Sequence, residues 1–198
     1  MQDQKDNWLE FAQADRTPID ITSDEQPLPY GTGHPKRLKG IVDLLKVNRV
    51  LDLGCNAAIW SPIFGNSEYY GLDQELGMLP IAKTNKPDGI FILGMGEDLP
   101  FKDSFFDLVF TSHVLQHNTH YPEKDQIVRE IRRVLRPNGY YLCIENTGED
   151  AKLSDKSFTV EGWVSFIFTR GFSFLGHWPT EEFLFRKDSV QETFDGTW

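Results

Sequence analysis

The sequence is poor in cysteine, with only Cys55 and Cys143 among its 198 residues. Both lie in or beside apolar runs that are typical of strands, so we expect reduced, buried thiols rather than a bridge. A fold stabilised by disulfides is therefore excluded, and a cytoplasmic setting is favoured. The spacing of the cysteines and methionines does not match a metal site, so no metal is expected.

Long apolar runs are also missing. No run approaches the roughly 20 residues that cross a bilayer, and the polar stretch 1–7 does not have the pattern of a signal peptide. We expect no membrane partner.

Positive charge is scarce: the sequence has 20 Lys and Arg residues against 30 Asp and Glu residues, which gives a net charge of −10. Nucleic acid is therefore an unlikely main partner, since phosphate binding needs a basic face. The one basic cluster has the spacing of a solvated helix face and comprises Arg129, Arg132, Arg133 and Arg136. A small molecule is the expected partner, and the oligomeric state stays open.

What the chain does have is a regular alternation of short apolar runs with helical patterns. The predicted strands are Arg49–Leu53, Tyr69–Leu72, Gly89–Leu93, Phe106–Thr111 and Tyr140–Glu145. The predicted helices are Pro35–Lys46, Ala57–Phe64, Gln74–Thr84, Ser112–His117 and Pro122–Leu135. Strands that alternate with helices are typical of a parallel sheet covered on both faces.

The C-terminal part departs from this alternation. A helix over Thr159–Arg170 is followed by two aromatic-rich strands, Phe172–His177 and Phe183–Arg186, with no helix between them. Such strands pair antiparallel. We therefore predict an α/β, Rossmann-like doubly wound sheet that is mostly parallel with a C-terminal antiparallel hairpin. The predicted organisation is an N-terminal extension or lid, partly disordered (1–33), one domain (34–190) and a tail (191–198).

Candidate binding residues follow the first two strands. Gly54 permits a tight turn and close approach of a ligand, and Asn56 tolerates the left-handed conformation. Asp73 ends the second strand, 19 residues after Gly54, a position that suits a carboxylate bound to ribose hydroxyls. A lone Asp at such a place is otherwise a helix cap.

Five segments now carry a family resemblance: VLDLGC (50–55), GLDQE (71–75), EDLPF (97–101), FDLVFTSHVLQH (106–117) and REIRRVLRPNGYYL (129–142). In this order and spacing the chain resembles class I methyltransferases that use S-adenosylmethionine, in the small-molecule branch with DLGCG and LPF-type motifs. The likeness covers about residues 34–188.

The resemblance implies particular roles for individual residues. Asp52, Gly54, Cys55 and Asn56 would flank the methionine part of the cofactor, and Asp73 would hold its ribose. The adenine would lie beside Gly96 and Glu97, with Leu72, Gln74 and Met95 around it. Thr111 and Ser112 would face the sulfonium and the substrate, and residues 130–139 would serve structure.

Two positions depart from the family pattern. The loop that commonly reads G-C-G-x-G has Asn56 and Ala58 in place of two glycines, and Met95 stands where an acid would accept from the adenine. Methionine is a poor acceptor, so we expect weakened rather than abolished binding. A non-catalytic binding module is therefore an alternative. An NAD(P)-dependent oxidoreductase is another, although it would need G-x-G-x-x-G where only Gly54 is present.

The catalytic candidates are His117 and His113, which follow the fourth strand and can titrate near neutral pH. His117 is favoured because it lies one helical turn from His113. Tyr30, His120 and Trp163 are candidate substrate contacts. For any single histidine the favoured alternative is a surface or packing residue, and the aromatic residues can supply core area.

Overall fold

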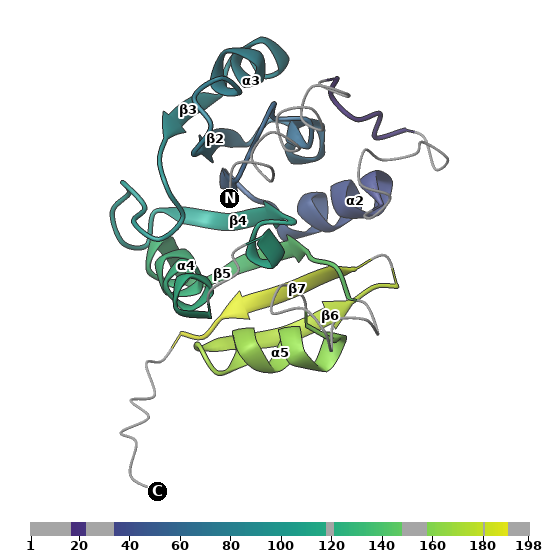
Figure 1. Ribbon diagram of the computed structural model, residues 1–198. Coiled ribbons are helices and arrows are strands. Elements are labelled where there is room, and N and C mark those ends of the chain that lie inside the picture. The colour runs from purple at the N-terminus through teal and green to yellow at the C-terminus, as the bar shows by residue number, and fades with distance from the viewer. Residues whose placement is uncertain (1–16, 23–33, 118–120, 148–157, 180, 190–198) are drawn as a thin grey trace, which may run out of the picture.

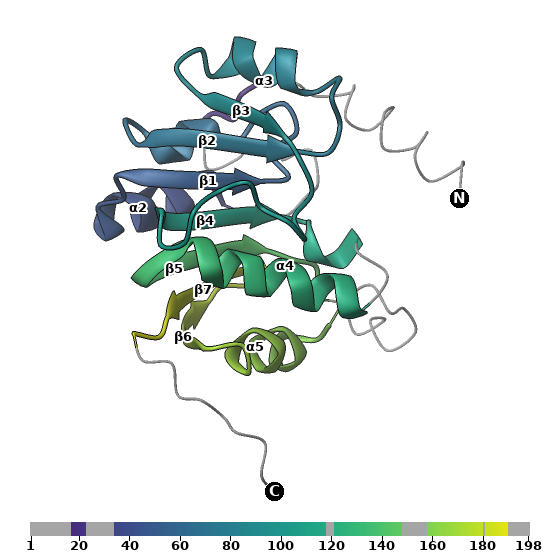
Figure 2. The same cartoon turned by 90° about the vertical axis from the view of Figure 1, so that its left-hand side faces the viewer.

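The computed structural model describes residues 17–22, 34–117, 121–147, 158–179 and 181–189. Within them, seven strands form one sheet in the order β3-β2-β1-β4-β5-β7-β6 (Figures 1 and 2). The fold class is therefore the predicted one: a Rossmann-like sheet whose parallel part ends in an antiparallel hairpin.

The parallel part comprises β1 (Arg49–Leu53), β2 (Glu68–Asp73), β3 (Ile90–Leu93), β4 (Phe106–Ser112) and β5 (Leu135–Ile144). The hairpin strands are β6 (Phe172–His177) and β7 (Glu182–Lys187). Strand β7 pairs antiparallel with both β5 and β6. Because β1 to β5 are parallel, their carboxyl ends meet at one edge of the sheet, and the residue before β7 lies at that same edge.

The helices are α2 (Pro35–Leu45), α3 (Leu79–Asn85), α4 (Tyr121–Val134) and α5 (Val160–Phe168), with single 3-10 turns η1 (Ser61–Phe64) and η2 (Leu115–His117). The Thr159 side chain caps α5, since it accepts from Gly162 N. Gly171, at φ +81°, closes the following turn.

Three predicted helices are too long. Only η1 forms within 57–64 and only η2 within 112–117, because Ala58 and His113 have left-handed backbones, with φ of 55° and 59°. The helix predicted from Gln74 begins at Leu79 instead, where Pro80 occupies the first turn. Proline is tolerated there because its missing N–H has no helical partner.

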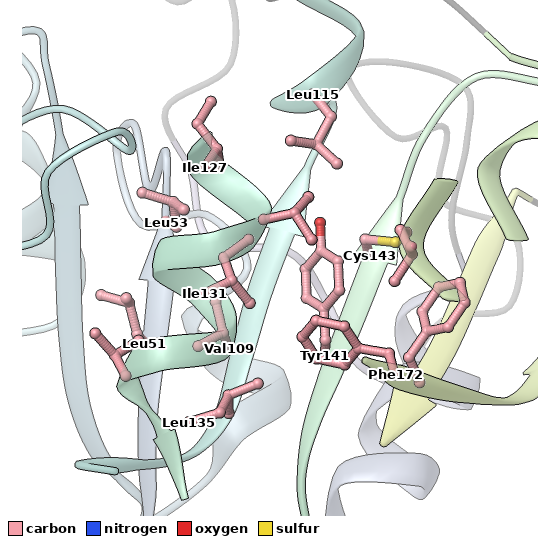
Figure 3. Packing of buried hydrophobic residues seen from close by; sticks show 14 of the residues in the cluster. Leu51, Leu53, Val109, Leu115, Ile127, Ile131, Leu135, Tyr141, Cys143 and Phe172 are labelled. Carbon is pink, nitrogen blue, oxygen red and sulfur yellow. The ribbon is translucent and has the colours of Figure 1, made fainter. Parts of the chain in front are cut away.

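Two clusters of buried side chains lie on opposite faces of the sheet. One joins the sheet to α4 and α5 and includes Leu51, Val109, Ile131, Tyr141 and Phe172 (Figure 3). The other joins it to α2, η1 and α3 and includes Leu38, Val50, Phe64, Ala82 and Phe110. Cys55 and Cys143 are free and buried, as predicted.

The described part of the predicted N-terminal extension packs against the domain. Ile19 is buried, and its N–H donates to Ile59 O at 3.0 Å. The remaining residues of 1–33, and the predicted tail 191–198, lie outside the described residues. Among the residues that the structure describes, no helix is long and apolar enough to cross a bilayer.

Candidate active site

The turn after β1 and the end of β2 meet at the carboxyl edge of the sheet. Gly54 N and Cys55 N both donate to Leu72 O, at 2.8 and 3.1 Å. Asn56 N donates to Asp73 Oδ2 at 2.7 Å. The two segments singled out in the sequence are therefore in direct contact.

The remaining N–H groups of this turn are also used within the protein. Ala57 N donates to Asn56 Oδ1 and Ala58 N to Cys55 O, both at 2.7 Å. Every N–H from Gly54 to Ala58 thus has a protein acceptor. A ligand can therefore approach the backbone of this turn closely, but it does not meet a row of unpaired N–H donors there.

The backbone of the turn keeps a glycine-like shape. Gly54 has φ +73°, Asn56 +47° and Ala58 +55°. A Cβ at Gly54 would lie 2.6 Å from Val114 Cγ2, so only glycine fits without a shift. The positions that depart from the family pattern therefore retain the left-handed conformation that glycine favours.

Two buried carboxyls flank the turn. Burial raises the pKa of Asp52 to about 7, against the lowering effect of the Tyr69 hydroxyl, which donates to it. Burial also raises the pKa of Asp73, while hydrogen bonds from Glu75 N and Asn56 N oppose the rise. Neighbouring carboxyls of this kind favour a cationic ligand over an anionic one.

The β3–β4 connection carries three of the predicted adenine contacts, of which Met95 is 57% exposed and Gly96 and Glu97 are half-buried. Gln74, which follows β2, is also exposed. A Cβ at Gly96 would lie 3.2 Å from Ile127, so this turn packs closely on α4. The segment lies at the end of β3, next to β2 in the sheet.

The end of β4 supplies the polar groups nearest the middle of this edge. Thr111 is fully buried, and its hydroxyl lies 3.0 Å from that of Tyr141. The resemblance implied that Thr111 faces the sulfonium and the substrate. In the structure its side chain lies in the core instead. Ser112 is half-buried and follows it at the strand end.

His113 is held in one orientation. Its Nδ1 lies 3.1 Å from Gln116 Oε1, and that oxygen also accepts from Asn146 N at 2.8 Å. Because Gln116 Oε1 is an acceptor, we assign the His113 proton to Nδ1, which puts the lone pair on Nε2. Burial lowers the pKa of His113, so its ring is neutral at pH 7.

Other predicted contacts lie elsewhere. Trp163 is fully buried in the core beneath α5, where its indole N–H donates to Asn146 O at 3.1 Å, so it does not line the site. The backbone of His117 ends η2, and its side chain lies outside the described structure. Tyr30 and His120 also lie outside the described residues.

Sequence reasoning missed Glu145, which follows β5. It is fully buried and accepts from Leu115 N and Gln116 N, both at 3.0 Å. Burial raises its pKa to about 8, and the buried Lys124 opposes the rise. A carboxylate directly after an apolar run is the same signal that singled out Asp73, so this residue was detectable.

A seven-stranded α/β sheet with its glycine turn and two carboxyls at the carboxyl edge is the arrangement of class I methyltransferases. Residues 51–143 match the family described as "Methyltransferase domain". Residues 51–143 of the chain are therefore similar to a methyltransferase domain.

Curated proteins show the same similarity. Over 71% of this chain and 64% of the relative, the sequence is 31% identical to a demethylmenaquinone methyltransferase of Thermotoga maritima. The chain spans less than two thirds of the length of this and the next curated relatives.

Solved structures share the fold. A putative sarcosine dimethylglycine methyltransferase from Galdieria sulphuraria superposes with a TM-score of 0.67 at 12% identity, covering 94% of this chain and 99% of that one. An amino pentose methyltransferase from Micromonospora echinaspora, solved with S-adenosylmethionine bound, gives 0.63 at 15% identity, over 77% and 90% of the two chains.

Proposed function

We propose that the chain transfers a methyl group from S-adenosylmethionine to a small-molecule acceptor. The observation that carries the proposal is the contact of the Gly54 turn with Asp73 beside the buried Asp52. This arrangement combines close backbone approach, a carboxylate for ribose hydroxyls and an acidic setting for a cation. S-adenosylmethionine carries a sulfonium and an ammonium, so its charge matches these groups.

The same contacts argue against a dinucleotide. A pyrophosphate needs open N–H donors at a helix N-terminus. Here the N–H groups of residues 54–58 are bonded within the protein, and the turn leads into the single 3-10 turn η1 rather than an α-helix.

A small acceptor is supported by the relatives. The Thermotoga maritima relative is named for demethylmenaquinone and the Micromonospora echinaspora structure for an amino pentose, both of them small molecules. The negative charge of this chain, −10, fits that class better than nucleic acid does.

Within this proposal the cofactor supplies an activated methyl group, and the chain supplies position and a proton acceptor. His113 is the better candidate base, because it is neutral and Gln116 fixes its ring. A neutral imidazole with its lone pair on Nε2 can accept the proton of a hydroxyl or amine. His117 stays a candidate, since its side chain lies outside the described structure.

Calorimetric titration tests the cofactor assignment. We expect S-adenosylmethionine and S-adenosylhomocysteine to bind the wild-type chain, and Asp73→Asn to weaken both by about 10–100-fold, the effect of losing hydrogen bonds to a charged group. Asp88→Asn is the matched control, because Asp88 is an exposed carboxylate paired with Lys86.

The unfolding midpoint of each variant is measured alongside, since Asp73 also anchors the turn. Binding of NADH without binding of either methionine derivative would reverse the assignment. Equal affinity of wild type and Asp73→Asn would remove Asp73 from the site.

A further inference from the structure

Three buried polar side-chain atoms in the described part of the chain have no hydrogen-bond partner. They are Trp60 Nε1, Ser112 Oγ and Glu181 Oε2. Native proteins leave few such atoms unpaired, because burying them without a partner is unfavourable. All three come from segments at the carboxyl edge of the sheet: the connection after β1, the end of β4 and the residue before β7.

Backbone hydrogen bonds connect the last two of these segments through β5. His113 N donates to Ile144 O at 2.8 Å, and Glu145 N donates to Glu181 O at 3.1 Å. The ends of β4 and β5 and the start of β7 are therefore neighbours across the edge, with about 4.8 Å between adjacent strands.

Trp60 lies beside β4 on the face that α2 covers. Its ring centroid is 5.8 Å from that of Phe110. Phe110 and Ser112 are two residues apart on one strand, so their side chains point to the same face. Trp60 also follows Ala58 by two residues, which puts its segment next to the proposed cofactor turn.

The protein orients the Glu181 carboxylate by one oxygen only. Oε1 accepts from Thr147 N at 2.6 Å, while Oε2 has no partner. An indole N–H only donates, an ionised carboxylate only accepts, and a hydroxyl does either. A molecule that satisfies all three atoms needs an oxygen acceptor for Trp60 and an O–H or N–H donor for Glu181.

We propose that Trp60, Ser112 and Glu181 bind the methyl acceptor, and that this acceptor is a small polar molecule with a hydroxyl or amino group held by Glu181. The inference rests on the proposed function and adds the chemical class of the substrate. The acceptor lies over the ends of β4 and β5, between the cofactor turn and the start of β7, with His113 at the same edge.

Stability measurements on the ligand-free protein test whether the unpaired Ser112 hydroxyl destabilises the fold, as expected of a group that binds a ligand. We expect Ser112→Ala to raise the unfolding midpoint by about 2–4 °C, because it removes a buried hydroxyl that has no partner. Thr111→Val is the matched control and should lower the midpoint, since the Thr111 hydroxyl lies 3.0 Å from that of Tyr141. A lower midpoint for both variants would overturn the proposal.

Ligand-observed NMR with saturating S-adenosylhomocysteine tests the acceptor class. The probes are 4-methoxybenzylamine, 4-methoxyphenol and 4-methylanisole, which share a ring and an ether oxygen, whereas only the first two carry a donor. We expect the amine or the phenol to bind, 4-methylanisole to bind at least tenfold more weakly, and Glu181→Gln to weaken the donor probe about tenfold. The control Glu161→Gln removes an exposed charge on α5 and should leave binding unchanged.

Absence of binding by all three probes, equal binding of 4-methylanisole, or unchanged binding in Glu181→Gln would overturn the proposal. Calorimetry with S-adenosylhomocysteine is run separately on each protein. If the wild-type chain fails to bind S-adenosylhomocysteine, the proposed function is contradicted. If it binds that compound normally but Glu181→Gln leaves probe binding unchanged, only the acceptor site is contradicted.

Discussion

Asn56 and Ala58 occupy positions at which class I methyltransferases commonly have glycine, and both adopt left-handed backbone. Asparagine tolerates this region because its side chain bonds locally, here through Oδ1 to Ala57 N. Alanine has no such compensation, so Ala58 is strained by its conformation. Replacement of the glycines has therefore left the shape of the turn intact at the expense of some stability.

This strain is measurable by comparing two neighbouring alanines. Ala57 and Ala58 are both buried, but only Ala58 has a positive φ. Substitution by glycine removes the same methyl group at each position and relieves strain only at 58. We expect Ala58→Gly to be about 1 kcal/mol more stable than Ala57→Gly in urea denaturation. Equal free energies of unfolding would show that the left-handed backbone at 58 is not strained.

Candidate site residues are predictable where they follow an apolar strand. The sequence singles out Gly54 and Asp73 in this way, and Glu145 gives the same signal. Glu181, of the proposed acceptor site, gives no such signal, because it lies in the β6–β7 turn, which carries no motif. Trp163 shows the opposite problem, since an aromatic residue in a helix can face a ligand or the core and its identity does not distinguish them.

At the scale of elements, α4 holds the Leu99-Pro100-Phe101 turn in place. Leu99 N donates to Glu130 Oε2 at 2.8 Å, and Arg133 bonds both that carboxylate oxygen and Leu99 O, at 2.7 and 2.9 Å. Arg133 also donates to Phe101 O at 2.7 Å. The segments 97–101 and 129–142, which carry two of the family motifs, thus contact each other. This contact agrees with the structural role implied for residues 130–139.

Removing this contact should destabilise the fold. We expect Arg133→Ala to lower the free energy of unfolding by about 2 kcal/mol, because Glu130 and two carbonyl groups lose their donor. Arg129→Ala serves as control: Arg129 is exposed and pairs only with Asp125 on the same helix, so its loss should be within about 0.5 kcal/mol. Chemical denaturation measures both. A similar small effect for the two arginines would mean that α4 does not hold the turn.

Strands were predicted more accurately than helices, and for a local reason. The strands β1 and β6 have the predicted bounds; β1 is buried over four consecutive residues, whereas in β6 only Phe172 is buried. Helix lengths depended on single backbone angles, at Ala58 and His113, that alanine and histidine do not signal in a sequence. Glycine or proline at those positions would have marked the breaks.

Over the whole molecule, some acidic groups of the sheet pair with arginine, including Glu182 with Arg37 at the carboxyl edge, and others have no such partner. At the amino edge Asp107 pairs with Arg136 and Glu68 with Arg49. At the carboxyl edge the partners of Asp52 and Asp73 are a tyrosine hydroxyl and backbone N–H groups. Buried carboxyls without a paired arginine or lysine are unfavourable when ionised, so the binding edge holds acidic groups at a cost in stability.

That cost predicts how stability changes with pH. The pKa of Asp52 is raised by burial from 3.8 to about 7, so between these values the folded chain binds more protons than the unfolded chain. The contribution of Asp52 to the free energy of unfolding must then fall as pH rises from 4 to 7. Above pH 7 this contribution no longer changes. The loss is on the order of 4 kcal/mol for the full shift.

Asp52→Asn isolates this contribution, because asparagine can still accept from the Tyr69 hydroxyl but does not ionise. Urea denaturation between pH 4 and 8 should therefore give a flatter profile for Asp52→Asn than for the wild type. Glu145, whose pKa is raised to about 8, remains in both proteins and cancels in the comparison. Asp88→Asn, at an exposed carboxyl, should retain the fall between pH 5 and 7. Parallel profiles for wild type and Asp52→Asn would mean that Asp52 is ionised throughout this range and that the binding edge carries its full negative charge.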